Sequence, residues 1–424
     1  MGLSLTFFTF RHLVCFSFLI FHLAIAHFIS SIQPLCHDHE RSALLNFKES
    51  LVINQTASSY PSAYPKVASW KLDEKDRDCC SWDGVKCDED TGHVVELDLA
   101  SSCLYGSINS TSSLFQLVHL QRLSLFDNNF NFSEIPSEIL NFSRLTHLNL
   151  SESYFSGQIP AELLELSNLE VLDLSFNNFD NFFLKLQKPG LATLAENLTN
   201  LVLNLINVNI SSTVPHTLAN LSSLCILSIS GCGLQGEFPQ EIFQLPNLQF
   251  LGLEHLYLSG NRFLDELPTS IGNLASLKAL EISSFNFSST LQASLGNLTQ
   301  LDSLTISNSN FSRLMSSSLS WLTNLNQLTS LNFPYCNLNN EIPFGISNLT
   351  QLTALDLSYN QLTGPIPYSL MKLKKVSSLL LGFNQLSGRI PVEISNLTQL
   401  QSLQLSSNQL EGSVPSSIFE LRNL

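Results

Sequence analysis

Residues 355–367 read Leu-Asp-Leu-Ser-Tyr-Asn-Gln-Leu-Thr-Gly-Pro-Ile-Pro, and nearly the same pattern returns at residues 379–391 and 403–415. Its first leucine recurs at intervals of 24 to 31 residues along most of the chain. The thirteen positions are Leu97, Leu123, Leu148, Leu172, Leu203, Leu227, Leu256, Leu280, Leu304, Leu331, Leu355, Leu379 and Leu403. So regular a period indicates stacked repeats, because a single copy could not bury its own apolar side.

The residue types within one copy predict its backbone. In Leu-x-Leu the two leucines point inward from a short strand, and the residues beside them point outward. The asparagine that follows can satisfy backbone groups at the turn with its side-chain amide. Six copies have it, at Asn128, Asn177, Asn261, Asn360, Asn384 and Asn408, and Ser102, Ser153, Ser309, Cys232 and Cys336 replace it in others. Val208 and Phe285 cannot bond in this way, so we expect the ladder of side-chain hydrogen bonds to be interrupted there.

These features predict an α/β repeat solenoid of leucine-rich repeats, with a curved horseshoe or superhelix shape and a parallel β-sheet on its concave face. We assign residues 93–424 to thirteen repeats and the start of a fourteenth, and residues 27–92 to an N-terminal cap held by disulfides. Two longer copies, near residues 185–197 and 249–254, carry insertions, which we interpret as extra loops on the outer side in preference to a functional island.

The first 26 residues are typical of a secretory signal. Arg11 precedes an apolar run over residues 13–25, and Ala24-Ile25-Ala26 provides small residues for cleavage. No later segment is apolar over the roughly 18 residues that a spanning helix needs. The sequence therefore predicts secretion.

Secretion determines how we interpret the cysteines. Cys36, Cys79, Cys80 and Cys87 cluster near the N-terminus, and in an oxidising compartment such a cluster predicts a disulfide framework. Zinc is the alternative, since His37-Asp38-His39-Glu40 lies nearby, but the paired C-x-x-C spacing is absent and we expect no metal. We expect Cys225, Cys232 and Cys336 to be buried thiols, and Cys103 lies near enough to the cap that it could pair.

The cap has its own expected core. Asp38 is the expected N-cap of a helix over residues 41–48, with Leu44, Phe47 and Leu51 on one face. Trp70 and Trp82 supply bulk to cover the first repeat.

N-glycosylation motifs are dense and fit a secreted glycoprotein, in which sugar would keep a charge-poor surface soluble. They occur at Asn54, Asn109, Asn131, Asn141, Asn149, Asn197, Asn209, Asn220, Asn286, Asn297, Asn310, Asn348 and Asn396.

Composition excludes several functions. The net charge of −15 and pI near 5.0 argue against nucleic-acid binding and against attachment to anionic membranes by a polybasic patch. Glycine-rich phosphate loops, H-E-x-x-H and a G-x-S-x-G following a strand are all absent from the sequence. We therefore expect neither catalysis nor a cofactor.

Recognition is the better hypothesis, and it should use outward positions on the strands. In the first four repeats these are Glu96, Asp98, Arg122, Phe126, Asp127, His147, Glu152, Glu170, Asp173 and Phe176. They form either an ordinary solvated face or an acidic patch that attracts a basic ligand. Tyr335, Tyr359 and Phe383 share one position in three later repeats, where they are either filler beside the asparagine or interface anchors.

The cap sequence resembles a known family. Residues 44–48 (Leu-Leu-Asn-Phe-Lys), residues 78–87 (Asp-Cys-Cys-Ser-Trp-Asp-Gly-Val-Lys-Cys) and residues 92–95 (Gly-His-Val-Val) resemble the N-terminal cap of plant extracellular leucine-rich-repeat proteins. Stretches such as residues 97–106 resemble receptor-like proteins of the Cf and Verticillium-resistance group. The resemblance implies Cys36–Cys79 and Cys80–Cys87 bridges, cell-surface display, and detection of pathogen molecules in plant defence.

The same resemblance implies a mode of action. Such receptors bind a pathogen-derived or endogenous peptide or protein and signal through leucine-rich-repeat receptor kinases that act as adaptor and co-receptor. The family continues with more repeats, a second cap and one membrane helix, whereas this sequence stops at residues 421–424. We therefore expect either a partial sequence of such a receptor or a truncated member, with the membrane helix outside this chain. The alternative is a soluble apoplastic inhibitor of a microbial wall-degrading enzyme, similar to polygalacturonase inhibitors, but these close after fewer repeats.

Overall fold

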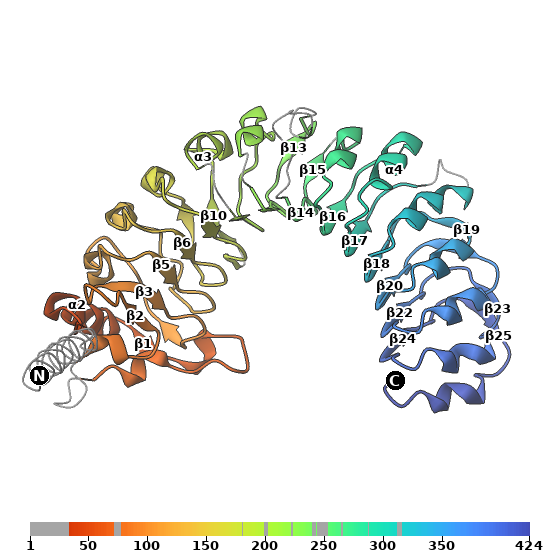
Figure 1. Cartoon of the computed structure of the whole chain (residues 1–424), viewed down its shortest axis with the longest axis horizontal. Coiled ribbons are helices and arrows are strands. Elements are labelled where there is room, and N and C mark those ends of the chain that lie inside the picture. Colours follow the sequence, from red (N-terminus) through yellow and green to blue (C-terminus); the bar gives the residue numbers. More distant parts are fainter. Residues whose placement is uncertain are drawn as a thin grey trace, which may run out of the picture.

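The protein forms a curved arc with strands along its inner side and short helices along its outer side (Figure 1). The computed structural model describes residues 34–71, 78–179, 181–198, 202–221, 224–239, 243, 253–263, 266–286, 288–311 and 316–424. The expected signal peptide, residues 1–26, lies outside the described residues. Within the described ranges, no helix combines the length and the hydropathy that crossing a bilayer would require.

In the described part of the chain, a sheet of fourteen strands lines the inner side of the arc. Its strands are β2 (Val85–Cys87), β3 (Val94–Asp98), β5 (Arg122–Ser124), β6 (His147–Asn149), β8 (Val171–Asp173), β11 (Val202–Asn204), β12 (Ile226–Ser228), β14 (His255–Tyr257), β16 (Ala279–Ser283), β17 (Ser303–Ser307), β18 (Ser330–Asn332), β20 (Ala354–Asp356), β22 (Ser378–Leu380) and β24 (Ser402–Gln404). β2 runs antiparallel to β3 and belongs to the cap, and the other thirteen strands are parallel.

The register of this sheet follows the sequence period. Leu97 lies opposite Leu123, Leu123 opposite Leu148, and the row continues through every predicted leucine to Leu403. The predicted solenoid with a parallel concave sheet is therefore confirmed.

The outer side is built from short helices. Among the described residues, two of them are α-helices, α3 (Leu191–Asn197) and α4 (Ser289–Leu295). The 3-10 helices there are η4 (Ser113–Gln116), η5 (Ser137–Asn141), η6 (Ala161–Glu165), η7 (His216–Asn220), η9 (Thr269–Asn273), η10 (Ser316–Asn324), η11 (Phe344–Asn348), η12 (Tyr368–Lys372), η13 (Val392–Asn396) and η14 (Ser416–Glu420). A proline precedes most of them, for example Pro367 before η12 and Pro391 before η13. Its fixed φ and missing N–H suit the residue at which a helix begins.

Short strands on the flank of the arc connect the inner and outer sides. They are β1 (Val52–Ile53) paired with β4 (Leu104–Tyr105), β7 (Gly157–Gln158) with β10 (Phe182–Lys185) and β9 (Asn178–Phe179), β13 (Gln235–Gly236) with β15 (Arg262–Phe263), β19 (Asn339–Glu341) with β21 (Gln361–Thr363), and β23 (Ser387–Arg389) with β25 (Gln409–Glu411).

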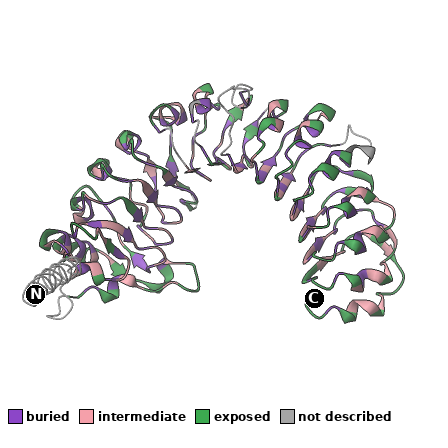
Figure 2. Cartoon of the chain, in the orientation of Figure 1, coloured by how far each residue is buried: buried purple, intermediate pink, exposed green. Residues whose placement is uncertain are grey.

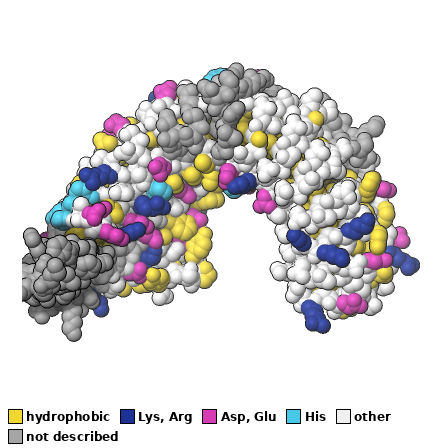
Figure 3. Space-filling model, in the orientation of Figure 1, with side chains coloured by type: hydrophobic (Ala, Val, Ile, Leu, Met, Phe, Trp, Pro, Cys, Tyr) yellow, Lys and Arg dark blue, Asp and Glu magenta, His cyan; other side chains and the backbone are white. Residues whose placement is uncertain are grey.

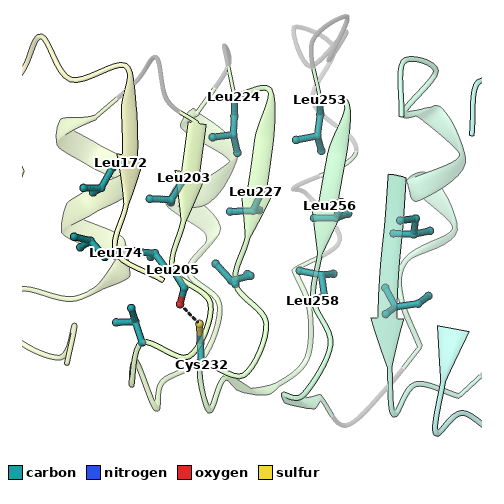
Figure 4. Close-up of a cluster of buried hydrophobic side chains, with 14 of the residues drawn as sticks. Leu172, Leu174, Leu203, Leu205, Leu224, Leu227, Cys232, Leu253, Leu256 and Leu258 are labelled. Carbon is teal, nitrogen blue, oxygen red and sulfur yellow. Dashed lines mark hydrogen bonds between the residues drawn. The ribbon is translucent and has the colours of Figure 1, made fainter. Parts of the chain in front are cut away.

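Leucines stacked between the two sides form one continuous core, seen as the buried band in Figure 2. Figure 4 shows part of it, where Leu172, Leu203, Leu227 and Leu256 project from successive strands into the same layer. Burying one such side chain contributes about 1.5–3 kcal/mol, so stacking neighbours supplies the stability that one repeat lacks.

The predicted hydrogen-bond ladder lies beneath the strands. Asn128 Nδ2 donates to the carbonyl oxygens of Leu99 (2.8 Å) and Leu125 (2.9 Å), and its Oδ1 accepts from the amides of Ser102 (3.2 Å) and Leu104 (2.9 Å). Each such asparagine therefore joins its own repeat to the one before it.

The substituted positions behave as their chemistry predicts. Cys232 Sγ donates to the carbonyl oxygen of Leu205 at 3.0 Å (Figure 4). Val208 and Phe285 instead pack into the core with 1% and 2% of their surface exposed, so the ladder is interrupted there.

The cap begins with helix α2 (Asp38–Glu49), followed by the 3-10 helices η1 (Gln55–Ala57), η2 (Lys66–Ser69) and η3 (Cys79–Ser81). The prediction that Asp38 caps α2 is wrong: His37 occupies the N-cap position, and Asp38 is the first helical residue, paired with Arg41 at 2.7 Å. An Asp at that position still interacts favourably with the helix dipole.

The core of the cap contains both predicted tryptophans. Trp70 stacks on Trp82 with ring centroids 5.7 Å apart. Disulfides join Cys36 to Cys79 and Cys80 to Cys87, which is the pairing that the resemblance implies.

The longer copy predicted to carry an insertion at residues 185–197 carries its extra residues earlier in the chain. A hairpin of β9 and β10 precedes the predicted range, and β10 pairs with β7 of the preceding repeat, whereas α3 within that range lies on the outer side. Backbone pairing with a flank strand satisfies groups that an exposed loop would leave to water. Most of the other longer copy, residues 249–252, lies outside the described residues.

The remaining cysteines are only partly as expected. Cys232 and Cys336 are buried, and burial raises the pKa of each thiol to about 12. Cys103 is also buried and is not in a disulfide. Cys225 is exposed, so the expectation that it is buried was wrong, because it lies at the edge of a strand instead of in the leucine layer.

Candidate ligand-binding surface

Charged side chains on the inner sheet concentrate at its N-terminal end. Strand register places Glu96 opposite Arg122, and Arg122 opposite His147. Asp98 and Asp173 lie in the other outward row, at the ends of β3 and β8. Figure 3 shows acidic and basic side chains on the inner side of this arm, beside hydrophobic ones. The period of the repeat thus aligns predicted residues from separate copies into one surface.

A hollow of about 400 Å³ lies over β3, β5, β6 and β8, and we call it the concave pocket. Five of the predicted residues line it: Glu96, Asp98, Arg122, Phe126 and His147. Its walls therefore carry charges of both signs and one aromatic ring, a composition suited to a polar peptide.

Some of these groups are already engaged. Asp98 Oδ2 pairs with Lys66 Nζ of the cap at 3.1 Å, and Asp98 Oδ1 accepts from the amide of Ala100. Burial lowers the pKa of His147, as does the nearby Arg122, so this imidazole stays neutral over a wider pH range. Glu96 and Arg122 remain as the charges most available to a ligand.

A second hollow of about 310 Å³ lies where the cap meets repeats two to four, and we call it the rim pocket. Its lining comprises Thr56, Ala57, Ser58, Ser59, Asp127, Glu152, Tyr154, Phe176, Asn178 and Phe179. Three of these, Asp127, Glu152 and Phe176, were predicted from the repeat pattern. The cap loop and the residues of β9 were not predicted, although the 31-residue spacing of this copy marked an insertion.

The residue four places after each aligned leucine has a positive φ in all thirteen repeats. Glycine holds it only at Gly231 and Gly260, and the others are Ser101, Asp127, Glu152, Phe176, Asn207, Ser284, Asn308, Tyr335, Tyr359, Phe383 and Ser407. Bulky residues rarely adopt this conformation, which the surrounding turn imposes.

The three later aromatics at this position form a stack. The ring of Tyr359 lies 4.3 Å from that of Tyr335 and 4.2 Å from that of Phe383, with interplanar angles of 16° and 7°. Their exposed fractions are 50% for Tyr335, 37% for Tyr359 and 40% for Phe383. The stack is thus both a contact between repeats and an exposed aromatic surface.

The predicted acidic patch does not form one uniform surface. Asp127 is only 2% exposed, so its expected outward placement was wrong: the cap loop covers it, and Ser59 donates to its Oδ1. Asp173 accepts from Ser175 and from Asn204 Nδ2, which gives it a structural role at the turn. Glu170 lies close enough to His147 to affect its pKa.

A cluster of histidines lies where helix α2 meets the start of β3. Donor atoms of Glu40, His93 and His119 lie within 4.8 Å of one another. The rings of His37, His93 and His119 stack, with centroids 3.9 Å and 3.7 Å apart. In stacked imidazoles the in-plane lone pairs lie side by side and do not point toward a common metal ion. In addition, the buried carboxylate of Glu40 already accepts a hydrogen bond from the amide of Val94. This geometry favours a structural cluster over a metal site.

Most glycosylation motifs lie where a sugar could attach. Ten of the predicted asparagines are exposed: Asn54, Asn109, Asn131, Asn141, Asn197, Asn286, Asn297, Asn310, Asn348 and Asn396. Asn209 and Asn149 are half-buried, and Asn149 lines the concave pocket. The side chain of Asn220 is outside the described part of the chain.

Sequence comparison matches both parts of the chain to known families. A family described as "Leucine rich repeat N-terminal domain" matches residues 37–88, and "Leucine-rich repeat region" matches residues 193–341. "Leucine Rich Repeat" matches residues 144–166, 168–188, 351–373 and 399–421.

The curated relatives of this chain include two plant receptor-like proteins. Receptor-like protein 6 of Arabidopsis thaliana is 39% identical over 268 residues, which cover 59% of this chain and 26% of the relative. Receptor-like protein Cf-9 of Solanum pimpinellifolium is 38% identical over 303 residues, which cover 58% of this chain and 31% of the relative. The matched part thus spans about a quarter to a third of the length of these relatives.

Solved structures share the fold. The structure of PEPR1 with AtPEP1 has a TM-score of 0.58 at 28% identity, covering 91% of this chain and 54% of that one. The peptide hormone receptor RGFR1 in complex with RGF2 has a TM-score of 0.50 at 28% identity, covering 81% and 67%. A Leptospira interrogans leucine-rich-repeat protein reaches 0.57 at 28% identity, covering 75% and 81%, so the fold alone does not define a plant receptor.

The cap, the repeats and the aligned leucines agree with these comparisons. The chain belongs to the leucine-rich-repeat proteins and is similar to plant receptor-like proteins of the Cf-9 type.

Proposed function

We propose that the chain is the recognition part of an extracellular receptor of plant innate immunity, which binds a pathogen-derived or endogenous peptide or protein on its concave face. The observation that carries this proposal is the concave pocket, where Glu96 and Arg122 face the inner side of a solenoid similar to PEPR1 and RGFR1. RGFR1 is a plant peptide hormone receptor whose structure was solved in complex with RGF2, and PEPR1 was solved together with AtPEP1. A binding role also fits the absence of catalytic motifs from the sequence.

Signalling would require partners. The similarity to receptor-like proteins supports leucine-rich-repeat receptor kinases as adaptor and co-receptor, at the plasma membrane and on its extracellular side. The chain itself would supply ligand recognition and a surface for these partners.

Binding can be tested with the full chain, secreted from plant cells as a glycoprotein. Peptides selected from a displayed random library would be measured by calorimetry against wild type and against the double variant Glu96→Gln/Arg122→Ala. We expect at least tenfold weaker binding by the double variant, because these two charges line the concave pocket.

Glu165→Gln provides the matched control, since Glu165 is exposed on η6, on the outer side of the same arm. This variant should bind as wild type does. Peptides that bind the double variant with unchanged affinity would place recognition elsewhere and overturn the proposal.

A further inference from the structure

The rim pocket contains a carboxylate with an unfilled hydrogen-bonding position. Asp127 Oδ1 accepts from the amide (2.7 Å) and the hydroxyl (2.9 Å) of Ser59. The other oxygen, Oδ2, is buried and has no hydrogen-bond partner among the described residues. A buried polar atom normally has a partner, because losing water without replacement is costly. Asp127 lines the rim pocket, so a donor that enters the pocket reaches this oxygen once the cap loop at residues 58–59, which covers Asp127, shifts.

The second carboxylate of the pocket adds negative charge. Glu152 occupies the same repeat position as Asp127 in the next copy and also lines the pocket. Burial raises the pKa of Glu152, and the charges of Asp127 and Asp173 raise it further. Among the described residues, neither pocket carboxylate forms a salt bridge. A cation in the pocket would relieve this repulsion.

The remaining walls favour an organic cation over a metal ion. Tyr154, Phe176 and Phe179 line the pocket, and the rings of Tyr154 and Phe179 lie 5.4 Å apart. Phe176 and Phe179 are about half exposed, at 45% and 50%. Ca²⁺ takes six to eight oxygen ligands, whereas aromatic faces attract guanidinium and ammonium groups.

We propose that the rim pocket binds the side chain of an arginine in the ligand of this receptor. The planar guanidinium has donors for the free oxygen of Asp127 and for Glu152, and it can stack on an aromatic face at the same time. The cap loop at residues 56–59 forms one wall, so the cap contributes to ligand recognition as well as closing the solenoid. This inference extends the proposed function by naming one determinant of the ligand.

The test uses a defined probe, the tripeptide acetyl-Gly-Arg-Gly-amide, with the full secreted chain. Its binding would be measured by saturation-transfer NMR and compared with that of the citrulline analogue, which has nearly the same shape but no charge, and of the lysine analogue. We expect at least tenfold weaker binding of the citrulline analogue and several-fold weaker binding of the lysine analogue. Equal binding of the arginine and citrulline probes would overturn the proposal, and equal binding of lysine would overturn the guanidinium assignment.

Variants locate the site. Asp127→Asn keeps an oxygen for Ser59, and asparagine holds the equivalent position at Asn207 and Asn308, so this variant should fold. It should bind the arginine probe at least tenfold more weakly, whereas the matched control Asp302→Asn, at an exposed remote carboxylate, should bind it unchanged. Glu152→Gln gives a second reading should Asp127→Asn fail to be secreted. Unchanged binding by the folded pocket variants, or displacement of the probe by millimolar CaCl₂, would refute the site.

The outcome is separable from that of the proposed function. One outcome is that the library selects peptides that lack arginine, that need Glu96 and Arg122 for binding, and whose affinity Asp127→Asn does not change. Such peptides would refute this inference and leave the receptor proposal intact. Binding of the arginine probe in the rim pocket, with no peptide selected from the library, would instead support the arginine site and count against the receptor proposal.

Discussion

Replacing Asn128 with alanine tests whether buried hydrogen bonds, and not merely side-chain volume, hold adjacent repeats together. Asn128 is fully buried, and its Oδ1 is the acceptor for the amides of Ser102 and Leu104. In Asn128→Ala both amides lose this acceptor in a place that water does not reach. Each such loss costs about 1–3 kcal/mol, so we expect the two losses together to cost this variant about 2–6 kcal/mol of local stability.

Asn408→Ala is the matched comparison. Asn408 makes the same kinds of bonds, accepting from the amide of Leu386 (3.0 Å) and donating to the carbonyl oxygens of Leu381 (3.0 Å) and Leu405 (3.1 Å). Asn408 is half-exposed, so water can take the place of the removed amide. We therefore expect this variant to lose only about 1 kcal/mol.

Amide hydrogen exchange with mass spectrometry suits a solenoid, because repeats can open locally without global unfolding. The free energy of local opening would be followed in peptides covering residues 98–105 and 381–388, in wild type and in each variant. Equal losses at the two sites would refute the argument, because they would mean that lost packing volume and not desolvation sets the cost. A loss below about 1 kcal/mol for Asn128→Ala would also refute it.

Three further predictions concern other sites. Cys232 and Cys336 should resist alkylation in the native protein at pH 8, because burial raises the pKa of both thiols to about 12. The exposed Cys225 should react under the same conditions. Mass spectrometry of the digested protein would show which of these cysteines carry the label. Tyr359→Ala should destabilise the later repeats by about 1–2 kcal/mol, because it removes the stacking on Tyr335 and Phe383. Tyr359→Gly should destabilise them by less, because glycine adopts the positive φ of this position freely. Denaturant unfolding that shows a larger loss of stability for Tyr359→Gly than for Tyr359→Ala would contradict this. Burial and the neighbouring His93 lower the pKa of His119, so the unfolded chain binds the proton more readily than the folded chain. The free energy of unfolding should therefore fall as the pH drops below about 6.5, and it should depend less steeply on pH in His119→Gln. An unchanged slope in this variant would contradict the assignment to His119.

The local pattern of the sequence was enough to predict the solenoid. A leucine such as Leu355 has the same neighbours in the chain as its counterparts in other copies, so each copy folds alike and stacks in one register. The strands, the asparagine ladder and its interruption at Val208 all follow from side chains within a single repeat or its neighbour. The concave row that contains Glu96 and Arg122 was predictable for the same reason.

The rim pocket depends on tertiary structure, because its walls come from segments that share no period. Residues 56–59 belong to the cap, and Asn178 and Phe179 belong to the insertion, so no spacing rule relates them to Asp127. The burial of Asp127 likewise results from a cap loop nearly seventy residues earlier in the chain. Repetition let the sequence determine how the copies stack, whereas contacts between non-repeating segments were fixed only when the cap and the insertion packed against that stack.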